Sequence, residues 1–496
     1  MSLRSDYEKL VSELRRLKEL ASIGQILGWD EEVNLPPESG AMRAAQHGAL
    51  AAVVHRDATA PALGELIAGL RAERDRLEPR ERAVVDWAHR DFHEATALPA
   101  ELVERRARLG SESCHAWRHA RAERDFSKFA PWLEKQVDMN REVATHLGKG
   151  DRVYDYCIDR HDPGLDAAFV TEVFAKLRAG LIPLSQQILA KARPAAPADE
   201  RRPVCPDADQ LKFCREVTGA LGFDYSRGRI DSSTHPFCSG DAHDCRLTTR
   251  FAADNPPDAL LSAIHEAGHG MYAQGLPADH TGDALGRDAG MAVHESQSRL
   301  WENQVARSGA FWRWCTPVLR RHFPEWLPHE TAEGHTRRMN AVAPTLIRVD
   351  ADEATYNQHI LLRFELERRL FDGSLRVRDL PEAWAEQART LLGRTPAHDA
   401  EGVLQDIHWS WGEFGYFPSY TLGNMMAAAL WDAYRAGRPG WEDDFARGEF
   451  APLLAFLRER VHRHGRTLGA RELCRAATGA DLAPDALLRH LRERYL

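Results

Sequence analysis

Five consecutive residues, His265-Glu266-Ala267-Gly268-His269, combine two histidines and a glutamate in the HExxH pattern. On an α-helix, residues four positions apart lie one turn above each other, so the two imidazoles could bind one metal ion. The glutamate would then project beside the metal, where a carboxylate can act as a general base toward water. The spacing therefore predicts a metal-dependent hydrolase.

The residues around this motif predict the helix that carries it. Asn255 is the predicted N-cap of this helix, and the prolines and the acid that follow it suit a first turn. The helix is expected to end at Gly275. A glycine inside a helix costs about 1 kcal/mol relative to alanine. We therefore expect something to pass close to the backbone at Gly268 and Gly270. The apolar stripe of this helix is predicted at Leu260, Leu261, Ile264 and Met271.

A third ligand is predicted on a second helix, over residues 292–301. A catalytic zinc usually has three protein ligands and one open position. Two antiparallel helices joined by a glycine-containing loop can bring Glu295 to both imidazoles. For Glu295 alone, the alternative is an exposed acid on a helix surface. His89 and His93 have the same spacing as the motif histidines but lack the glutamate, and we interpret them as part of a helix face.

Five further motifs occur in chain order, and with HExxH they resemble those of the carboxypeptidase Taq family, the thermostable carboxypeptidases. The five are residues 235–237 (HPF), 244–248 (DCRLT, like DxRxT), 294–297 (HESQ), 347–352 (IRVDAD, like IRxxAD) and 402–409 (GVLQDIHW, like GxxQDxHW). Trp29, Asp30, Pro36, Pro37 and Arg43 also resemble the N-terminal segment of the family. The resemblance runs from about residue 25 to about residue 425.

This resemblance implies a mainly α-helical peptidase of the zincin type, with a central substrate groove and a few short strands near the active site. It implies a cytosolic homodimer that removes single residues from the free C-terminus of peptides, with broad specificity. By the same resemblance, His265, His269 and Glu295 are the metal ligands and Glu266 is the general base. Zinc is the expected metal ion, and cobalt is expected to substitute for it.

A carboxypeptidase must recognise a free carboxylate, which a guanidinium group binds through two hydrogen bonds. Arg348 is the first candidate for this role. Arg246 is the second, because residues 246–251 look like a short strand that this side chain could stabilise instead. A structural ion pair is the alternative for both arginines, with Asp244 and Asp352 as possible partners.

The oxyanion that forms during hydrolysis also needs hydrogen-bond donors. His408, Tyr416 and Tyr420 are the candidates, in a stretch rich in aromatic residues and glycines whose alternative role is the core. We assign His235 to substrate binding and His294 to supporting the metal site. Neither histidine has the spacing of a fourth ligand.

The remaining sequence predicts a mainly helical protein with few strands. We expect a single domain over residues 1–496, which could be divided into a helical lobe (1–192) and a motif-bearing catalytic lobe (204–496). The Pro- and Ala-rich residues 193–200 are the candidate linker. The clearest helical periodicity occurs in residues 7–27, 354–370 and 451–461.

Charge and composition exclude several classes of function. The net charge of −9 argues against nucleic-acid binding, and no apolar stretch predicts a membrane span or a signal peptide. The eight cysteines form no CxxC pattern, which suits a reducing, cytoplasmic location. Cys238 and Cys245 are close enough in sequence to pair, but free thiols are the preferred interpretation.

Two other functions share parts of this pattern. An endopeptidase or aminopeptidase could use the same HExxH and downstream glutamate, and only the arginine motifs and the family resemblance favour a carboxypeptidase. A helical scaffold with a structural zinc is the second alternative. Structural sites are usually closed by four ligands, however, whereas three ligands and a free glutamate are predicted for this chain.

Overall fold

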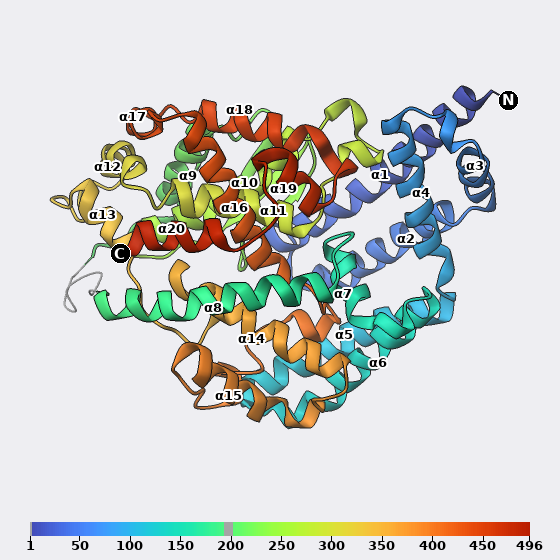
Figure 1. The fold of residues 1–496 in the computed structure, drawn as a ribbon, viewed down its shortest axis with the longest axis horizontal. Coiled ribbons are helices and arrows are strands. Elements are labelled where there is room, and N and C mark those ends of the chain that lie inside the picture. Colours follow the sequence, from blue (N-terminus) through green and yellow to red (C-terminus); the bar gives the residue numbers. More distant parts are fainter. Residues whose placement is uncertain (1, 193–201) are drawn as a thin grey trace.

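The computed structural model describes residues 2–192 and 202–496, and α-helices make up most of it (Figure 1). The mainly helical fold with few strands is therefore confirmed. The predicted linker 193–200 lies outside the described residues. No helix of the described part is long and apolar enough to cross a membrane.

Helices make up most of the described residues, and three of them match the segments with the clearest helical periodicity. These three are α1, α14 and α18. The helices before the sheet are α1 (Leu3–Val33), α2 (Gly40–Ala58), α3 (Pro61–Ala72), α4 (Pro79–Ala97), α5 (Ala100–Glu123), α6 (Ala130–His146), α7 (Val153–His161), α8 (Ala167–Lys191) and α9 (Asp207–Leu221). The helices after it are α10 (Pro256–Gly275), α11 (Met291–Arg299), α12 (Gly309–His322), α13 (Ala332–Met339), α14 (Glu353–Phe371), α15 (Leu380–Leu392), α16 (Phe417–Gly437), α17 (Trp441–Ala446), α18 (Ala451–Arg460), α19 (Ala470–Thr478) and α20 (Asp485–Tyr495).

Two clusters of buried apolar side chains hold these helices together. The smaller cluster joins α1, α3 and α4 to Leu285, in the loop before α11. The larger one extends from Leu102 to Leu491 and includes residues on both sides of the segment 193–201. In Figure 1, α8 lies between α14 and α20, and it packs against both. The core is thus continuous between the two lobes considered from the sequence.

A three-stranded sheet lies beside α10. Strand β3 (Cys245–Thr249) pairs in parallel with β1 (Gly228–Ser232) and antiparallel with the short edge strand β2 (Cys238–Gly240). The strand expected at 246–251 therefore exists, displaced by one or two residues. The sulfur atoms of Cys238 and Cys245 lie 3.6 Å apart, and both cysteines are free thiols, as preferred from the sequence.

Helix α10 begins and ends where the sequence predicts, with a proline pair in its first turn and Gly275 as its last residue. Asn255 occupies the N-cap position, but its side chain makes no capping hydrogen bond. The second predicted helix, 292–301, is α11 up to Arg299 and then a π-helical turn, Leu300–Val305. Such wider turns inside helices are rare and are often found at functional sites.

Helix α11 is enclosed between α10 and α16, and a glycine allows the close approach on each side. A Cβ atom on Gly268 would lie 2.6 Å from Cα of Ser298, and one on Gly423 would lie 2.7 Å from Cβ of Glu295. Gly270 likewise allows the sheet to approach α10, because a Cβ atom at this position would lie 2.9 Å from a methyl group of Leu247. The expectation that something passes close to this backbone is confirmed, and the neighbours are α11 at Gly268 and the side chain of Leu247 at Gly270.

We expect Gly268→Ala to destabilise the protein by about 1–3 kcal/mol, because the new methyl group would push α11 away from α10. Unfolding by heat or denaturant measures the effect. Gly69→Ala is the matched control, since nothing lies within 4 Å of a Cβ atom at this position of α3. The control should be neutral or more stable by about 0.5–1 kcal/mol. Equal stability of Gly268→Ala and the native chain would contradict the tight approach.

Candidate metal centre

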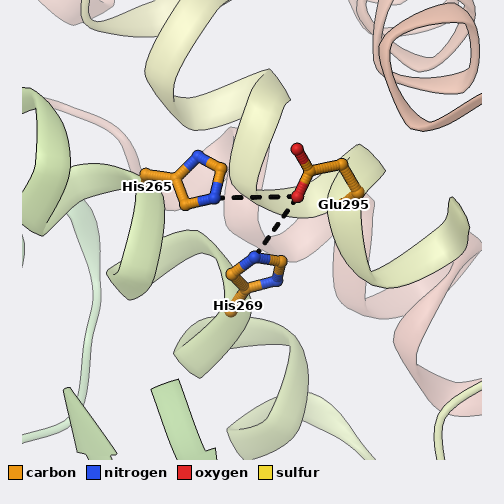
Figure 2. A group of neighbouring side chains, drawn as sticks. All are labelled: His265, His269 and Glu295. Carbon is orange, nitrogen blue, oxygen red and sulfur yellow. Dashed lines mark ion pairs between the residues drawn. The ribbon is translucent and has the colours of Figure 1, made fainter. Parts of the chain in front are cut away.

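The three predicted ligands converge on one point, between α10 and α11 (Figure 2). Nε2 of His265 lies 3.6 Å from Oε2 of Glu295, and Nε2 of His269 lies 3.4 Å from the same oxygen. All three candidate ligand atoms lie within 4.8 Å of one another. Within residues 2–192 and 202–496, no other group of at least three His, Cys, Asp or Glu side chains has such an arrangement.

The outer nitrogen of each imidazole is held by a neighbouring side chain. Nδ1 of His265 lies 2.8 Å from Oε2 of Glu302, and Nδ1 of His269 lies 2.7 Å from Nδ1 of His294. A proton on Nδ1 of each ligand histidine leaves its Nε2 lone pair free to face Glu295. Histidines that bind metals usually have such an outer partner, which fixes the tautomer and the ring orientation. The donor set and its supports therefore fit a divalent metal ion.

Two arginines compensate the buried acids of this centre. Arg299 donates from Nε to Oε1 of Glu295 at 2.6 Å and from Nη1 to Oε2 of Glu302 at 3.1 Å. Arg307 donates from Nη2 to the other oxygen of Glu302 at 3.4 Å. Burial opposes ionisation of Glu302, but Arg299 and His265 outweigh it and lower its pKa to about 2. Both acids are therefore held as carboxylates, the form that binds metals or orients an imidazole.

Glu302 and Arg299 are not among the candidates from the sequence, although their spacing is informative. Positions 295, 299 and 302 follow each other at intervals of four and three, which places them on one side of a helix. The seven-residue interval between Glu295 and Glu302 could therefore have indicated from the sequence that Glu302 lies near the candidate ligand. The partner of that acid, His265, lies on another helix and could not be read from the spacing.

Glu266 lies beside the candidate ligands with only 7% of its surface exposed. Burial raises its pKa to about 7, and the charges of Glu295 and Glu302 act in the same direction while His265 opposes them. A carboxylate with such a pKa can accept and return a proton near neutral pH. Burial also lowers the pKa of His269 to about 3, so this imidazole is neutral, as a metal ligand must be.

Arg348 is buried and already paired. Its Nε donates to Oδ1 of Asp406 at 2.9 Å, its Nη1 donates to the hydroxyl of Tyr356 at 3.2 Å, and its guanidinium lies 5.1 Å from the ring centre of Tyr420. The suggested pairing with Asp352 is wrong. Asp352 instead caps α14, where its Oδ1 accepts from the backbone N–H of Thr355 at 3.0 Å, and its Oδ2 accepts from the N–H of Ala343 at 3.0 Å.

Arg246 is positioned by the sheet and by α1. Its Nη2 donates to Oδ2 of Asp244 at 2.8 Å, so the predicted pairing of these two residues is confirmed. The guanidinium also lies 4.4 Å from the ring centre of Trp29, which is buried on α1. This arginine lines a cavity of about 540 Å³ between α1 and the β2–β3 hairpin. The strand and the tryptophan give it a structural role, and the cavity leaves it accessible.

The aromatic candidates form one group beside Arg348. Nε2 of His408 lies 3.2 Å from the hydroxyl of Tyr420, and the His408 and Tyr416 rings lie 5.2 Å apart. Both His408 and Tyr416 line a cavity of about 440 Å³ that also reaches Met291, at the start of α11. Burial lowers the pKa of His408 to about 3, so its ring is neutral. His235, in contrast, is exposed, and its carbonyl accepts from the hydroxyl of Ser233 at 2.7 Å.

Known proteins resemble this chain over its whole length. The family profile described as carboxypeptidase Taq (M32) metallopeptidase matches residues 9–495. A thermostable carboxypeptidase 1 of Thermus thermophilus is 37% identical, over 100% of this chain and 99% of that protein. Another, of Pyrococcus furiosus, is 33% identical over 99% and 98%. The crystal structure of an M32 carboxypeptidase from Deinococcus radiodurans has a TM-score of 0.95 and 40% identity, over 99% of both chains. The family resemblance noted in the motifs is confirmed.

We expect Glu302→Gln to weaken metal binding by about 10- to 100-fold, because the imidazole of His265 loses its negatively charged partner. Competition with a chelator of known affinity measures the change. Glu365→Gln is the control, because this glutamate pairs with Arg368 on α14 and should leave metal binding unchanged. Native affinity in Glu302→Gln would show that this carboxylate does not support the site.

Proposed function

We propose how this chain, a metallocarboxypeptidase of the carboxypeptidase Taq (M32) family, acts on its substrates. It releases single amino acids from the free C-terminus of peptides, and the reaction takes place at the centre formed by His265, His269 and Glu295. The observation that supports the proposal most strongly is the convergence of these three side chains. In addition, the Nδ1 atom of each histidine contacts a neighbouring side chain, which orients the ring. Two imidazoles and one carboxylate leave a coordination position open.

Zinc is the metal that we propose for this centre, with cobalt as a possible substitute. Two histidines and one glutamate form a ligand set typical of catalytic zinc in peptidases. When bound, the ion would supply a Lewis acid that makes water more acidic and polarises a carbonyl group. Arg299 contributes by keeping Glu295 ionised, and Glu302 by orienting His265.

We assign Glu266 as the general base. Its carboxylate would take a proton from the attacking water and pass it to the nitrogen of the leaving amino acid. The burial of Glu266 matches this task, because a raised pKa makes its carboxylate a stronger base toward water. A pKa near neutrality still lets the acid return the proton within the same turnover. A bound cation beside it favours the ionised form, so the pKa in the loaded protein should be at or below the value of about 7 found without metal.

Arg348 is our first candidate for binding the terminal carboxylate of the substrate. Asp406 and Tyr356 hold its guanidinium in place, which reduces the entropy lost when a substrate binds. His408 and Tyr420, which touch each other next to Arg348, are the candidate donors to the oxyanion. Arg246, which lines the cavity beside α1, and the exposed His235 are further candidates for contacts with the peptide.

Broad side-chain specificity, a cytoplasmic location and a homodimeric state remain predictions from the family resemblance. We also propose that residues 1–496 act as one domain. The continuous core supports this, because buried apolar residues from Leu102 to Leu491 form one cluster. Light scattering of the purified protein would establish the number of subunits.

A matched pair of peptides tests the proposed reaction. One peptide has a free C-terminus and the other is the same peptide amidated, each with and without a chelator. We expect stepwise loss of C-terminal residues from the free acid alone, stopped by the chelator and restored by added zinc. Internal cleavage, or equal cleavage of both peptides, would instead favour an endopeptidase or aminopeptidase. No metal-dependent cleavage of either peptide would favour a structural metal site.

Glu266→Gln provides the control within the active site. Turnover should fall by at least about 100-fold, while metal content stays that of the native chain. In the native chain, kcat/KM should decrease as the pH falls through the pKa of Glu266, because the protonated acid cannot act as a base. Loss of the metal from Glu266→Gln would mean that this glutamate supports the ion and is not simply the base.

Arg348→Ala tests the recognition of the terminal carboxylate. We expect kcat/KM for the free acid to fall by about 10- to 100-fold, since a charge-assisted hydrogen-bond pair is lost. Any residual cleavage of the amidated peptide should change much less. Arg376→Ala is the control, because this exposed arginine pairs only with Asp379 among the contacts seen. Equal losses on both peptides would refute the assignment.

A further inference from the structure

Helix α20 ends against the π-helical turn Leu300–Val305 that follows the ligand helix. Nη1 of Arg494 donates to the carbonyl oxygen of Asn303, and Nη2 donates to that of Gln304 at 3.4 Å. The Arg494 side chain is only 12% exposed. In Figure 1, α20 lies near α8 and α16, and it packs against both. One buried guanidinium therefore connects the last helix with the segment that supports the metal centre.

These two carbonyl groups need a partner because they lie at the end of a helix. The last four carbonyl groups of a helix have no N–H group of the next turn to accept from, and the C-terminal end carries a partial negative charge. A guanidinium satisfies both requirements, since it carries a positive charge and several N–H groups. Arg494 thus caps the end of the π-helical turn from a distance of 191 positions along the chain.

Arg494 is itself held by a buried acid at the start of α14. Oε2 of Glu353 lies 3.3 Å from Nη1 of Arg494 and accepts from the hydroxyl of Tyr495 at 3.0 Å. Oε1 of the same acid lies 2.8 Å from Nε2 of His490. Glu353 is only 7% exposed. The guanidinium is therefore fixed between this carboxylate and the two carbonyl groups.

Glu302 is the residue immediately before Asn303 in the turn. Its side chain contacts His265 on one oxygen and Arg307 on the other. Arg307 also donates from Nε to the side-chain oxygen of Asn303 at 3.1 Å. The position of Glu302 thus depends on the same short segment that Arg494 caps.

We propose that Arg494 is a positioning residue for the metal centre: by fixing the end of the π-helical turn, it places Glu302 against His265 and thereby sets the affinity of the centre for its metal ion. The proposal rests on the proposed ligands His265, His269 and Glu295. It adds a long-range support, from α20, that lies outside all six family motifs. A turn without this cap would be free to relax, and Glu302 would lose its fixed distance to Nδ1 of His265.

Metal affinity, measured by chelator competition on the full chain, tests the proposal. We expect Arg494→Ala to bind zinc about 3- to 10-fold more weakly than the native chain, a smaller loss than for a direct partner of a ligand. Arg494→Lys keeps the charge beside Glu353 but cannot reach both carbonyl groups at once, so its affinity should be intermediate. Arg489→Ala is the control, because this α20 arginine pairs with Asp432 and should bind zinc like the native chain.

A double-mutant cycle separates positioning from general damage to the fold. If Arg494 acts through Glu302, adding Arg494→Ala to Glu302→Gln should weaken zinc binding less than twofold further. The melting temperature of each metal-free variant shows whether it is folded. If Arg494→Ala does not fold, the same cycle with Arg494→Lys gives the answer.

Native zinc affinity in a folded Arg494→Ala would overturn the proposal, and so would losses that multiply in the double variant. Failure of the proposed metal centre itself would look different. In that case the native chain would bind no zinc, or would bind it equally well after His269→Ala.

Discussion

The candidate metal centre depends on how closely three helices can pack. Helix α11 carries Glu295, and it can reach the two histidines of α10 only because Gly268 has no side chain between the helices. On the opposite side, Gly423 of α16 lies against the Cβ atom of Glu295 itself. A protein interior has the density of an organic crystal, so an extra methyl group at such a contact forces the neighbouring backbone to shift. The spacing of the ligands is therefore set by backbone contacts before any metal binds.

Close packing also brings several carboxylates together away from water, and nearby arginines stabilise two of them as anions. Glu266 and Glu295 are buried, Glu302 beside them is mostly buried, and isolated buried carboxylates would be unstable as anions. Arg299 lies between two of them and keeps both ionised. Among residues 2–192 and 202–496, no ion pair between Glu266 and an arginine is seen, and burial raises the pKa of Glu266. One cluster thus holds two permanent anions and one acid that can exchange a proton.

The sequence predicted the parts of this centre that depend on short spacing. His265 and His269 are four residues apart, and the helix boundaries and the third ligand followed from turn and helix signals in the same stretch. The supports of the centre could not be predicted in this way. Asp406, not Asp352, pairs with Arg348 across 58 positions of the chain, and Arg494 reaches Asn303 across 191. Contacts between distant segments depend on the packing of whole helices, which no local pattern specifies.

The candidate ligands lie close together in the sequence, but the side chains that position them come from distant segments, which affects how the centre forms during folding. The residues that would touch the metal all lie in the short stretch from His265 to Glu295, whereas Asp162, which accepts from the N–H of Ala292 at the start of α11, is 130 positions away. Contacts between such distant segments form slowly, because the chain loses much entropy when it closes a long loop. A peptide with only α10 and α11 would contain every ligand, yet it would lack the side chains that keep them at their proper distance. The geometry of the centre therefore requires the tertiary structure of the whole chain and cannot be produced by the motif alone.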